Sequence, residues 1–298
     1  MTWIFFALLT HLCWSFSNIG DKVVITKKFK NPFIYLFFGF CASAVILLFG
    51  LFVPISTPSL NTLFLSLLSA IFYVLLCFFY IKAVSVEEIS RIGIIWNIAP
   101  VFGLVAAWIF LGEKLQIQQL FALFMLMTGA FLASFHARGS KLRFSRAIIY
   151  MFFACMAFSL YAVSAKYAMT GVSFATFYFF FTLWLAPSSF IFFISKKFRA
   201  DFRVEKKNLT WSLFGVILLI SLVARLGIMF NQLALARGPV ALINAMEGFQ
   251  TVLMFLIAIL LTRFFPKILR EEIDKNNLFL KIASLFIMVV GVIYLSLQ

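Results

Sequence analysis

The chain has 298 residues, of which 64% are hydrophobic and only 12% are charged. A soluble domain is about half apolar and about a quarter charged, so this composition leaves too little polar surface to cover a water-soluble fold. The net charge of +15 would suggest a nucleic-acid partner in a soluble protein, but the basic residues stand in short runs between apolar segments, as is typical of membrane proteins. We therefore expect an all-α membrane protein with lipid as its outer solvent and no nucleic-acid partner.

Motifs of enzyme chemistry do not occur in this sequence. There is no Walker-type phosphate loop, no HExxH and no GxSxG, so neither an ATP-driven pump nor a hydrolase is predicted. The four cysteines (Cys13, Cys41, Cys77 and Cys155) lie in apolar segments without a CxxC pair, which predicts neither disulfides nor a zinc site. We expect no enzyme activity, no cofactor and no metal. No basic residue precedes the first apolar residues, so we expect the first helix to be retained rather than cleaved as a signal peptide.

Ten apolar stretches are each long enough to cross a bilayer as a helix, which takes about 20 residues. In chain order they cover approximately residues 3–21, 33–53, 60–81, 89–111, 116–136, 146–165, 173–195, 210–233, 240–263 and 277–297. Of the 25 Lys and Arg residues, 21 belong to the odd-numbered connections, three to the even-numbered ones, and Arg225 lies within a stretch. The positive-inside rule therefore predicts that the odd-numbered connections face the cytoplasm and that both termini lie outside a cytoplasmic (inner) membrane.

The two halves of the chain resemble each other at a fixed separation of 144 residues. The matching pairs are Trp14 with Phe158, Ser15 with Ser159, and Lys22 with Lys166. Because each copy holds five helices, the second copy must insert upside down, and inverted repeats are a hallmark of secondary transporters with a substrate site near the membrane midplane. We expect two inverted five-helix repeats, residues 1–138 and 139–298. A duplication without a transport role is the alternative.

Two ionisable residues lie inside expected membrane helices, where a charge costs about 2.5 to 3.5 kcal/mol. Arg225 lies ten residues before the Ala236–Pro239 turn and Glu247 lies eight residues after it. The two helices are antiparallel, so both residues reach a similar depth and an ion pair between them is geometrically open. The pair is either a structural lock, or a site where Arg225 holds an anionic group and Glu247 exchanges with it or titrates. Polar neighbours at helical spacing, Ser221 among them, favour the second interpretation.

Further candidates are polar and aromatic side chains that need a partner in hydrocarbon. His11, Ser15 and Asn18 form a polar stripe on the first helix, although a lone membrane histidine is more often a packing residue. The candidate substrate-binding or coupling residues are Arg225, Glu247, Asn244, Gln250, Thr251, Gln232, Asn18, His11, Trp14, Tyr80, Trp96, Asn97 and Tyr161. Before the fourth helix, Glu88, Ser90 and Arg91 are the candidates for a cytoplasmic gate, and a solvated helix start is the alternative.

One local pattern resembles a known family. Pro100-Val101-Phe102 is followed by Leu111-Gly112-Glu113-Lys114-Leu115 and then by Gly129, which is similar to the EamA type of the drug/metabolite transporter superfamily, with its two five-helix repeats. The second half departs from the pattern: Gln250-Thr251-Val252 stands where Pro-Val is usual, and Glu271 or Glu272 stands for the glutamate of the turn. The resemblance implies export or exchange of small metabolites by alternating access. It also implies cytoplasmic termini, which disagrees with the distribution of basic residues.

Together these patterns predict a secondary transporter that moves a small polar or amphipathic metabolite by gradient-driven export or exchange. Its expected partners are the small-molecule substrate, membrane lipid and a coupling ion, either a proton or sodium. Two alternatives stay open: a flippase for a lipid-linked head group, and a membrane scaffold or sensor that transports nothing.

Overall fold

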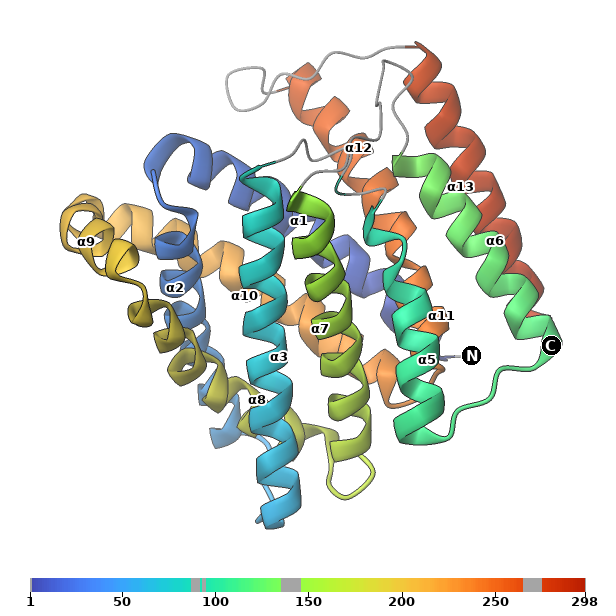
Figure 1. Ribbon diagram of the computed structural model, residues 1–298, viewed down its shortest axis with the longest axis horizontal. Coiled ribbons are helices and arrows are strands. Elements are labelled where there is room, and N and C mark those ends of the chain that lie inside the picture. The colour runs from blue at the N-terminus through green and yellow to red at the C-terminus, as the bar shows by residue number, and fades with distance from the viewer. Residues whose placement is uncertain (1, 87–91, 93–94, 135–145, 265–274, 298) are drawn as a thin grey trace.

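A computed structural model describes residues 2–86, 92, 95–134, 146–264 and 275–297 of the chain (Figure 1). Within these residues the structure is helical and has no strand. Nine helical segments of the described part are long and apolar enough to cross a membrane, and a shorter apolar helix covers Ala99–Leu111. The protein is therefore a multi-pass, all-helical membrane protein, which confirms that part of the prediction.

The helices of the first half are α1 (Thr2–Lys28), α2 (Pro32–Ala42), the 3₁₀ helix η1 (Ser43–Leu51), α3 (Leu60–Val84), α5 (Ala99–Leu111) and α6 (Ile117–Ser134). Those of the second half are α7 (Arg146–Ala168), α8 (Phe174–Ser189), η2 (Phe190–Ile194), α9 (Lys196–Glu205), η3 (Lys206–Asn208), α10 (Trp211–Leu235), α11 (Val240–Ala245), α12 (Glu247–Phe264) and α13 (Lys275–Ser296). Two expected spans need correction. The first helix continues to Lys28 rather than ending near residue 21, and the ninth span consists of two helices.

Helices from the two halves pack against each other throughout the bundle. The main pairs are α1 with α10 and α12, α3 with α7 and α8, α5 with α7 and α11, and α6 with α13. Figure 1 shows α6 and α13 side by side at one edge of the bundle and α9 at the opposite edge. Glycines allow two of these approaches: a Cβ at Gly103 would lie 2.7 Å from Asn244 Nδ2 in α11, and one at Gly129 would overlap Met288 in α13. Both glycines thus permit close helix packing.

Candidate functional site

Two membrane helices are interrupted in the same way. At each interruption the backbone makes hydrogen bonds that reach back three residues, a 3₁₀ pattern, and at the second one Met246 N also keeps the α-helical bond to Leu242 O at 3.2 Å. The bonds are Ile98 N to Ile95 O (3.1 Å) and Val101 N to Ile98 O (3.0 Å) before α5, and Met246 N to Ile243 O (3.2 Å) and Phe249 N to Met246 O (3.0 Å) between α11 and α12. The two sets of residues stand at a constant separation in the sequence. Residues 95, 98 and 101 correspond to residues 243, 246 and 249, each 148 positions later. We call these two places the helix breaks.

The first helix break has a clear chemical cause. Pro100 has no backbone N–H, so the carbonyl of Trp96 lacks its helical donor. The Cys155 thiol of α7 lies 3.9 Å from that oxygen, and the Ser159 hydroxyl donates to the Ala99 carbonyl at 3.2 Å. Neighbouring α7 therefore stabilises the polar backbone that the break exposes.

At the second helix break no proline is present, and the helix resumes with Glu247 and Gly248. The Ser15 hydroxyl of α1 lies 3.3 Å from the Gln250 carbonyl just beyond it. Ser15 and Ser159, which the sequence pairs at a separation of 144, thus each lie within 3.3 Å of a carbonyl close to one of the two helix breaks, although the shorter bond of Ser15 is to the His11 carbonyl at 2.6 Å.

Polar side chains next to the helix breaks are buried without hydrogen-bond partners among the described residues. They include Trp96 Nε1, both amide atoms of Asn244, and Glu247 Oε2. Glu247 interacts with Trp96 and with Tyr80, but the geometry between Glu247 and Trp96 falls short of a hydrogen bond. An unpaired buried polar group costs about 1 to 3 kcal/mol, so this region is suited to a polar ligand or water.

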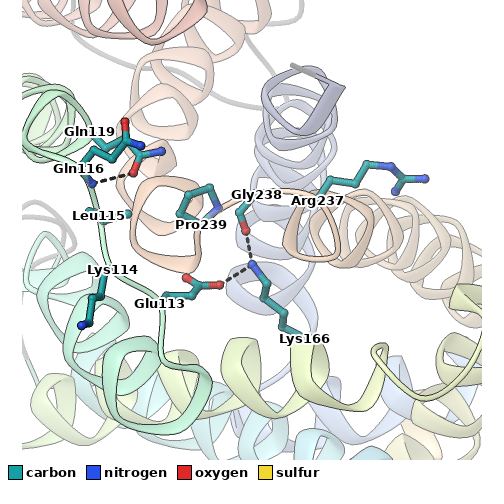
Figure 2. A pocket seen from close by; sticks show the side chains of 9 residues that line it. All are labelled: Glu113, Lys114, Leu115, Gln116, Gln119, Lys166, Arg237, Gly238 and Pro239. Carbon is teal, nitrogen blue, oxygen red and sulfur yellow. Dashed lines mark hydrogen bonds and ion pairs between the residues drawn. The ribbon is translucent and has the colours of Figure 1, made fainter. Parts of the chain in front are cut away.

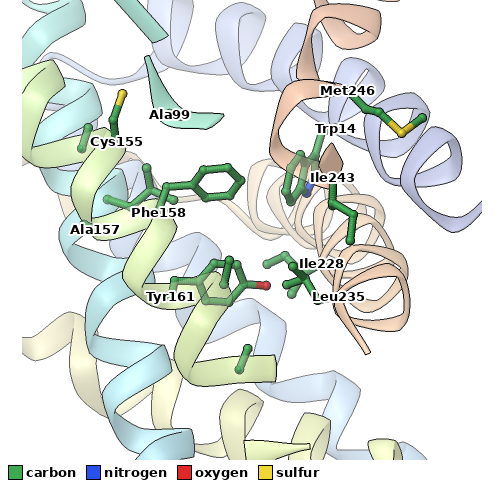
Figure 3. Close-up of a cluster of buried hydrophobic side chains, with 14 of the residues drawn as sticks. Trp14, Ala99, Cys155, Ala157, Phe158, Tyr161, Ile228, Leu235, Ile243 and Met246 are labelled. Carbon is green, nitrogen blue, oxygen red and sulfur yellow. The ribbon is translucent and has the colours of Figure 1, made fainter. Parts of the chain in front are cut away.

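A continuous column of aromatic rings runs from Glu247 through the centre of the bundle. We define the aromatic column as Tyr80, Trp96, Phe158, Tyr161 and Tyr73, whose successive ring centroids lie 5.6, 5.6, 6.2 and 5.3 Å apart. Trp14 lies beside it, 6.5 Å from Phe158. Figure 3 shows Phe158 and Tyr161 extending from α7 toward Trp14. Of the predicted candidates, Tyr80, Trp96, Tyr161 and Trp14 are brought together here.

Arg225 lies at the far end of the aromatic column and does not form an ion pair with Glu247. Its guanidinium carbon lies 5.4 Å from the Tyr73 ring centroid and 5.2 Å from that of Phe40. Its Nε and Nη1 atoms are buried without a hydrogen-bond partner in the described part of the chain. The carboxylate that interacts with Arg225 is Asp21 of α1, which also accepts a short hydrogen bond from Tyr35. Arg225 and Glu247 reach a similar depth along their helices, but the fold places their side chains at opposite ends of the aromatic column.

The remaining candidates lie around this centre. His11 Nδ1 is 3.4 Å from Gln250 Oε1, Asn18 Nδ2 is 3.9 Å from Met254 Sδ, and Gln232 Nε2 is 3.4 Å from the Tyr161 hydroxyl. Two are set apart: Asn97 points to α6, where its amide is 3.4 Å from Ser134 Oγ, and Thr251 lies one turn beyond Glu247 in α12. The predicted gate residues Glu88, Ser90 and Arg91 lie outside the described residues.

A polar contact joins three helix ends on the side of the even-numbered connections (Figure 2). Glu113 forms an ion pair with Lys166 at the end of α7, and its second oxygen accepts from Val240 N at 3.1 Å. Lys166 Nζ also donates to the Gly238 carbonyl at 2.6 Å. We call this arrangement the latch. It borders a pocket of about 400 Å³ that is also lined by Lys114 and Arg237, among others.

Sequence reasoning missed Asp21 and the latch. Asp21 is the last residue of the expected first span and was not among the candidates, whereas α1 continues to Lys28. The latch joins residues that are distant in sequence, so its contacts could not be read from the sequence. Its one local feature in the sequence is Gly112, which ends α5 with a φ of 67°. Glycine takes this left-handed conformation without steric cost, so the Leu111-Gly112-Glu113 motif is the turn that presents Glu113.

Fold and site together define a polytopic membrane protein with polar groups buried between broken helices. Residues 1–135 match the model of the EamA-like transporter family. That family is part of the drug/metabolite transporter superfamily, so the resemblance seen in the sequence is confirmed. Over these residues the chain is similar to a family of membrane transporters, which suggests a transporter of small molecules.

A solved structure described only as "Crystal structure of protein" superposes with a TM-score of 0.71. The two chains are 15% identical, and the alignment covers 99% of this chain and 96% of the other. At this identity the likeness concerns the fold alone. No curated protein sequence matches the chain.

Proposed function

We propose that the protein is a secondary transporter whose small polar or amphipathic substrate binds beside the aromatic column, between the two helix breaks. The observation that carries this proposal is the set of unpaired polar atoms on Trp96, Asn244 and Glu247. Buried polar groups are paired in the great majority of cases, and broken helices near the midplane are where transporters bind substrates and ions. A bound solute supplies the missing partners.

Alternating access by two inverted repeats is the proposed mechanism. In such a repeat, α1 corresponds to α7 and α3 corresponds to α10. The contact between α1 and α10 then has its counterpart in the contact between α7 and α3, and both contacts are present. The matching helix breaks and the matching serines Ser15 and Ser159 support the same relation. The proposed repeats are residues 1–138 and 139–298, and rocking of one against the other would open the site to each side of the cytoplasmic membrane in turn.

The two buried charges have separate proposed roles. Arg225 offers unpaired donors to an anionic group at the Tyr73 end of the aromatic column. Glu247, at the Trp96 end, is the proposed residue for coupling to a proton or sodium gradient. Because the described structure separates Arg225 from Glu247, we do not propose that Glu247 exchanges with the anionic group that Arg225 holds.

The test starts from the purified protein in detergent. A thermal-shift screen of metabolites identifies a ligand, and uptake of that ligand is then measured in proteoliposomes for wild type, Glu247→Gln and Arg225→Gln. We expect each site variant to lower the initial rate at least about tenfold, the effect of about 1.4 kcal/mol. The matched control is Arg263→Gln, an exposed arginine near the end of α12, which should transport normally. Wild-type rates in both site variants would overturn the proposed site.

A further inference from the structure

The connection between α8 and α10 forms a helix at the end of two membrane spans. The span Phe174–Ile194 ends two residues before α9 begins, and the next span starts at Trp211. A helix held between two such ends lies within reach of lipid head groups. Figure 1 places α9 at the edge of the bundle, next to α2.

The acidic and aromatic side chains of α9 face the protein. Glu205 is buried and accepts from the backbone N–H groups of Lys30 and Asn31, both at 3.1 Å. Asp201 accepts from the Asn31 side chain at 2.7 Å. The rings of Phe198 and Phe202 pack against Phe37 and Phe193. These contacts fix α9 to the turn between α1 and α2 and leave its basic side chains on the outside.

The outward surface of this connection is strongly basic. Its exposed cations are Lys196, Lys197, Arg199, Arg203, Lys206 and Lys207. Arg199 donates to the Phe193 and Ile194 carbonyls, while the other five form no ion pair with any described residue. Exposed apolar side chains lie on the same connection: Ile194 is 76%, Val204 67% and Trp211 90% exposed.

We propose that this surface, residues 194–211, binds the head groups of anionic phospholipids. Each Lys or Arg near an anionic leaflet strengthens membrane attachment by roughly fivefold in affinity. Tryptophan and aliphatic side chains favour the boundary between head groups and acyl chains, which explains the exposure of Trp211, Ile194 and Val204 beside the cations. A soluble acidic partner would match the charges but not these apolar side chains at the ends of two membrane spans.

Fluorescence quenching of the full-length protein in mixed micelles tests the proposal. Brominated phosphatidylglycerol and brominated phosphatidylcholine are titrated separately, and the difference between wild type and Trp211→Phe isolates the signal of Trp211. We expect the anionic lipid to quench Trp211 at a concentration at least about tenfold lower than the neutral lipid, and this preference to shrink as salt is raised.

Two charge-matched variants localise the effect. Lys197→Gln with Arg203→Gln should raise the half-quenching concentration of phosphatidylglycerol at least about tenfold. Arg146→Gln with Arg263→Gln, which removes two exposed cations from other helix ends, should change it less than about twofold. Equal quenching by both lipids, equal loss in both double variants, or displacement of the lipid by an acidic peptide of the same charge would overturn the proposal. If the α9 variant does not fold, the lipid and salt comparison on wild type still decides.

Discussion

Lys166 is held between the Glu113 carboxylate and the Gly238 carbonyl, so one ammonium group joins the ends of α5 and α7 and the turn between α10 and α11. Both side chains are about one-fifth exposed, Lys166 at 22% and Glu113 at 20%. The pair is therefore shielded enough from water to matter more than a surface ion pair.

Loss of either partner of the latch should destabilise the protein. We expect Lys166→Met and Glu113→Gln each to lower the free energy of unfolding by about 1 to 2 kcal/mol, because each leaves a partly buried charge without its partner. The double variant should cost less than the sum of the two. Thermal or denaturant unfolding in detergent measures all three, and Lys114→Met, which removes a neighbouring exposed cation, is the control. Additive effects would show that the pair does not act as a unit.

A second prediction concerns Asp21 and Arg225. Asp21→Asn removes the negative charge that interacts with Arg225 beyond ion-pair distance and weakens the charged hydrogen bond from Tyr35, and should lower the free energy of unfolding by about 1 to 3 kcal/mol. Combining Asp21→Asn with Arg225→Gln should recover part of that loss. Unfolding measurements on the single and double variants test the coupling. A single Asp21→Asn variant as stable as wild type would contradict the assigned partnership.

Pro100 should matter for movement rather than for stability. Pro100→Ala restores an N–H donor for the Trp96 carbonyl and should raise the stability by about 1 kcal/mol, while straightening the first helix break and slowing transport several-fold. Pro187→Ala is the control, because Pro187 interrupts α8 away from the helix breaks. Unfolding and proteoliposome uptake are measured on both. Unchanged uptake in Pro100→Ala would mean that the break plays no part in transport.

Two glycines of α10 provide a matched pair of variants. A Cβ at Gly227 would lie 2.5 Å from Trp14 Cδ1, whereas one at Gly215 would meet nothing within 4 Å. Gly227→Ala should therefore displace Trp14 from its place beside the aromatic column and destabilise the protein by about 1 to 3 kcal/mol. Gly215→Ala should stabilise it by up to about 1 kcal/mol through helix propensity. Ligand-induced thermal shifts, compared between the two variants, report whether the position of Trp14 matters for binding.

Much of the fold could be predicted from the sequence because apolar run length directly reports membrane crossing. Nine of the expected spans correspond to long apolar helices among the described residues. The expected first span ends near residue 21, whereas α1 continues to Lys28 and Asp21 accepts a hydrogen bond from Tyr35. The count of ten spans and the inverted repeat stay predictions.

The candidate site was only partly predictable. The candidates Tyr80, Trp96 and Tyr161 were chosen because a hydroxyl or indole N–H needs a partner in hydrocarbon, and the fold places their rings in one column. Their role in binding stays a prediction. The ion pair that the sequence left open between Arg225 and Glu247 is not formed in the structure, because equal depth on antiparallel helices does not fix the direction in which each side chain points. The helix break at Met246 could not be predicted because no proline lies there. The latch could not be predicted because its residues are far apart in the chain.

Pro100 leaves the Trp96 carbonyl without its helical donor at the start of α5, and prolines at such positions are a common cause of helix bending. The helix beyond Pro100 ends at the latch, while the preceding turn contacts Tyr80 and Phe158. Under the proposed alternating access, bending at Pro100 and at Met246 would let α5 and α12 tilt while the turns before them keep their contacts. Opening at one membrane surface would then not require the whole bundle to come apart.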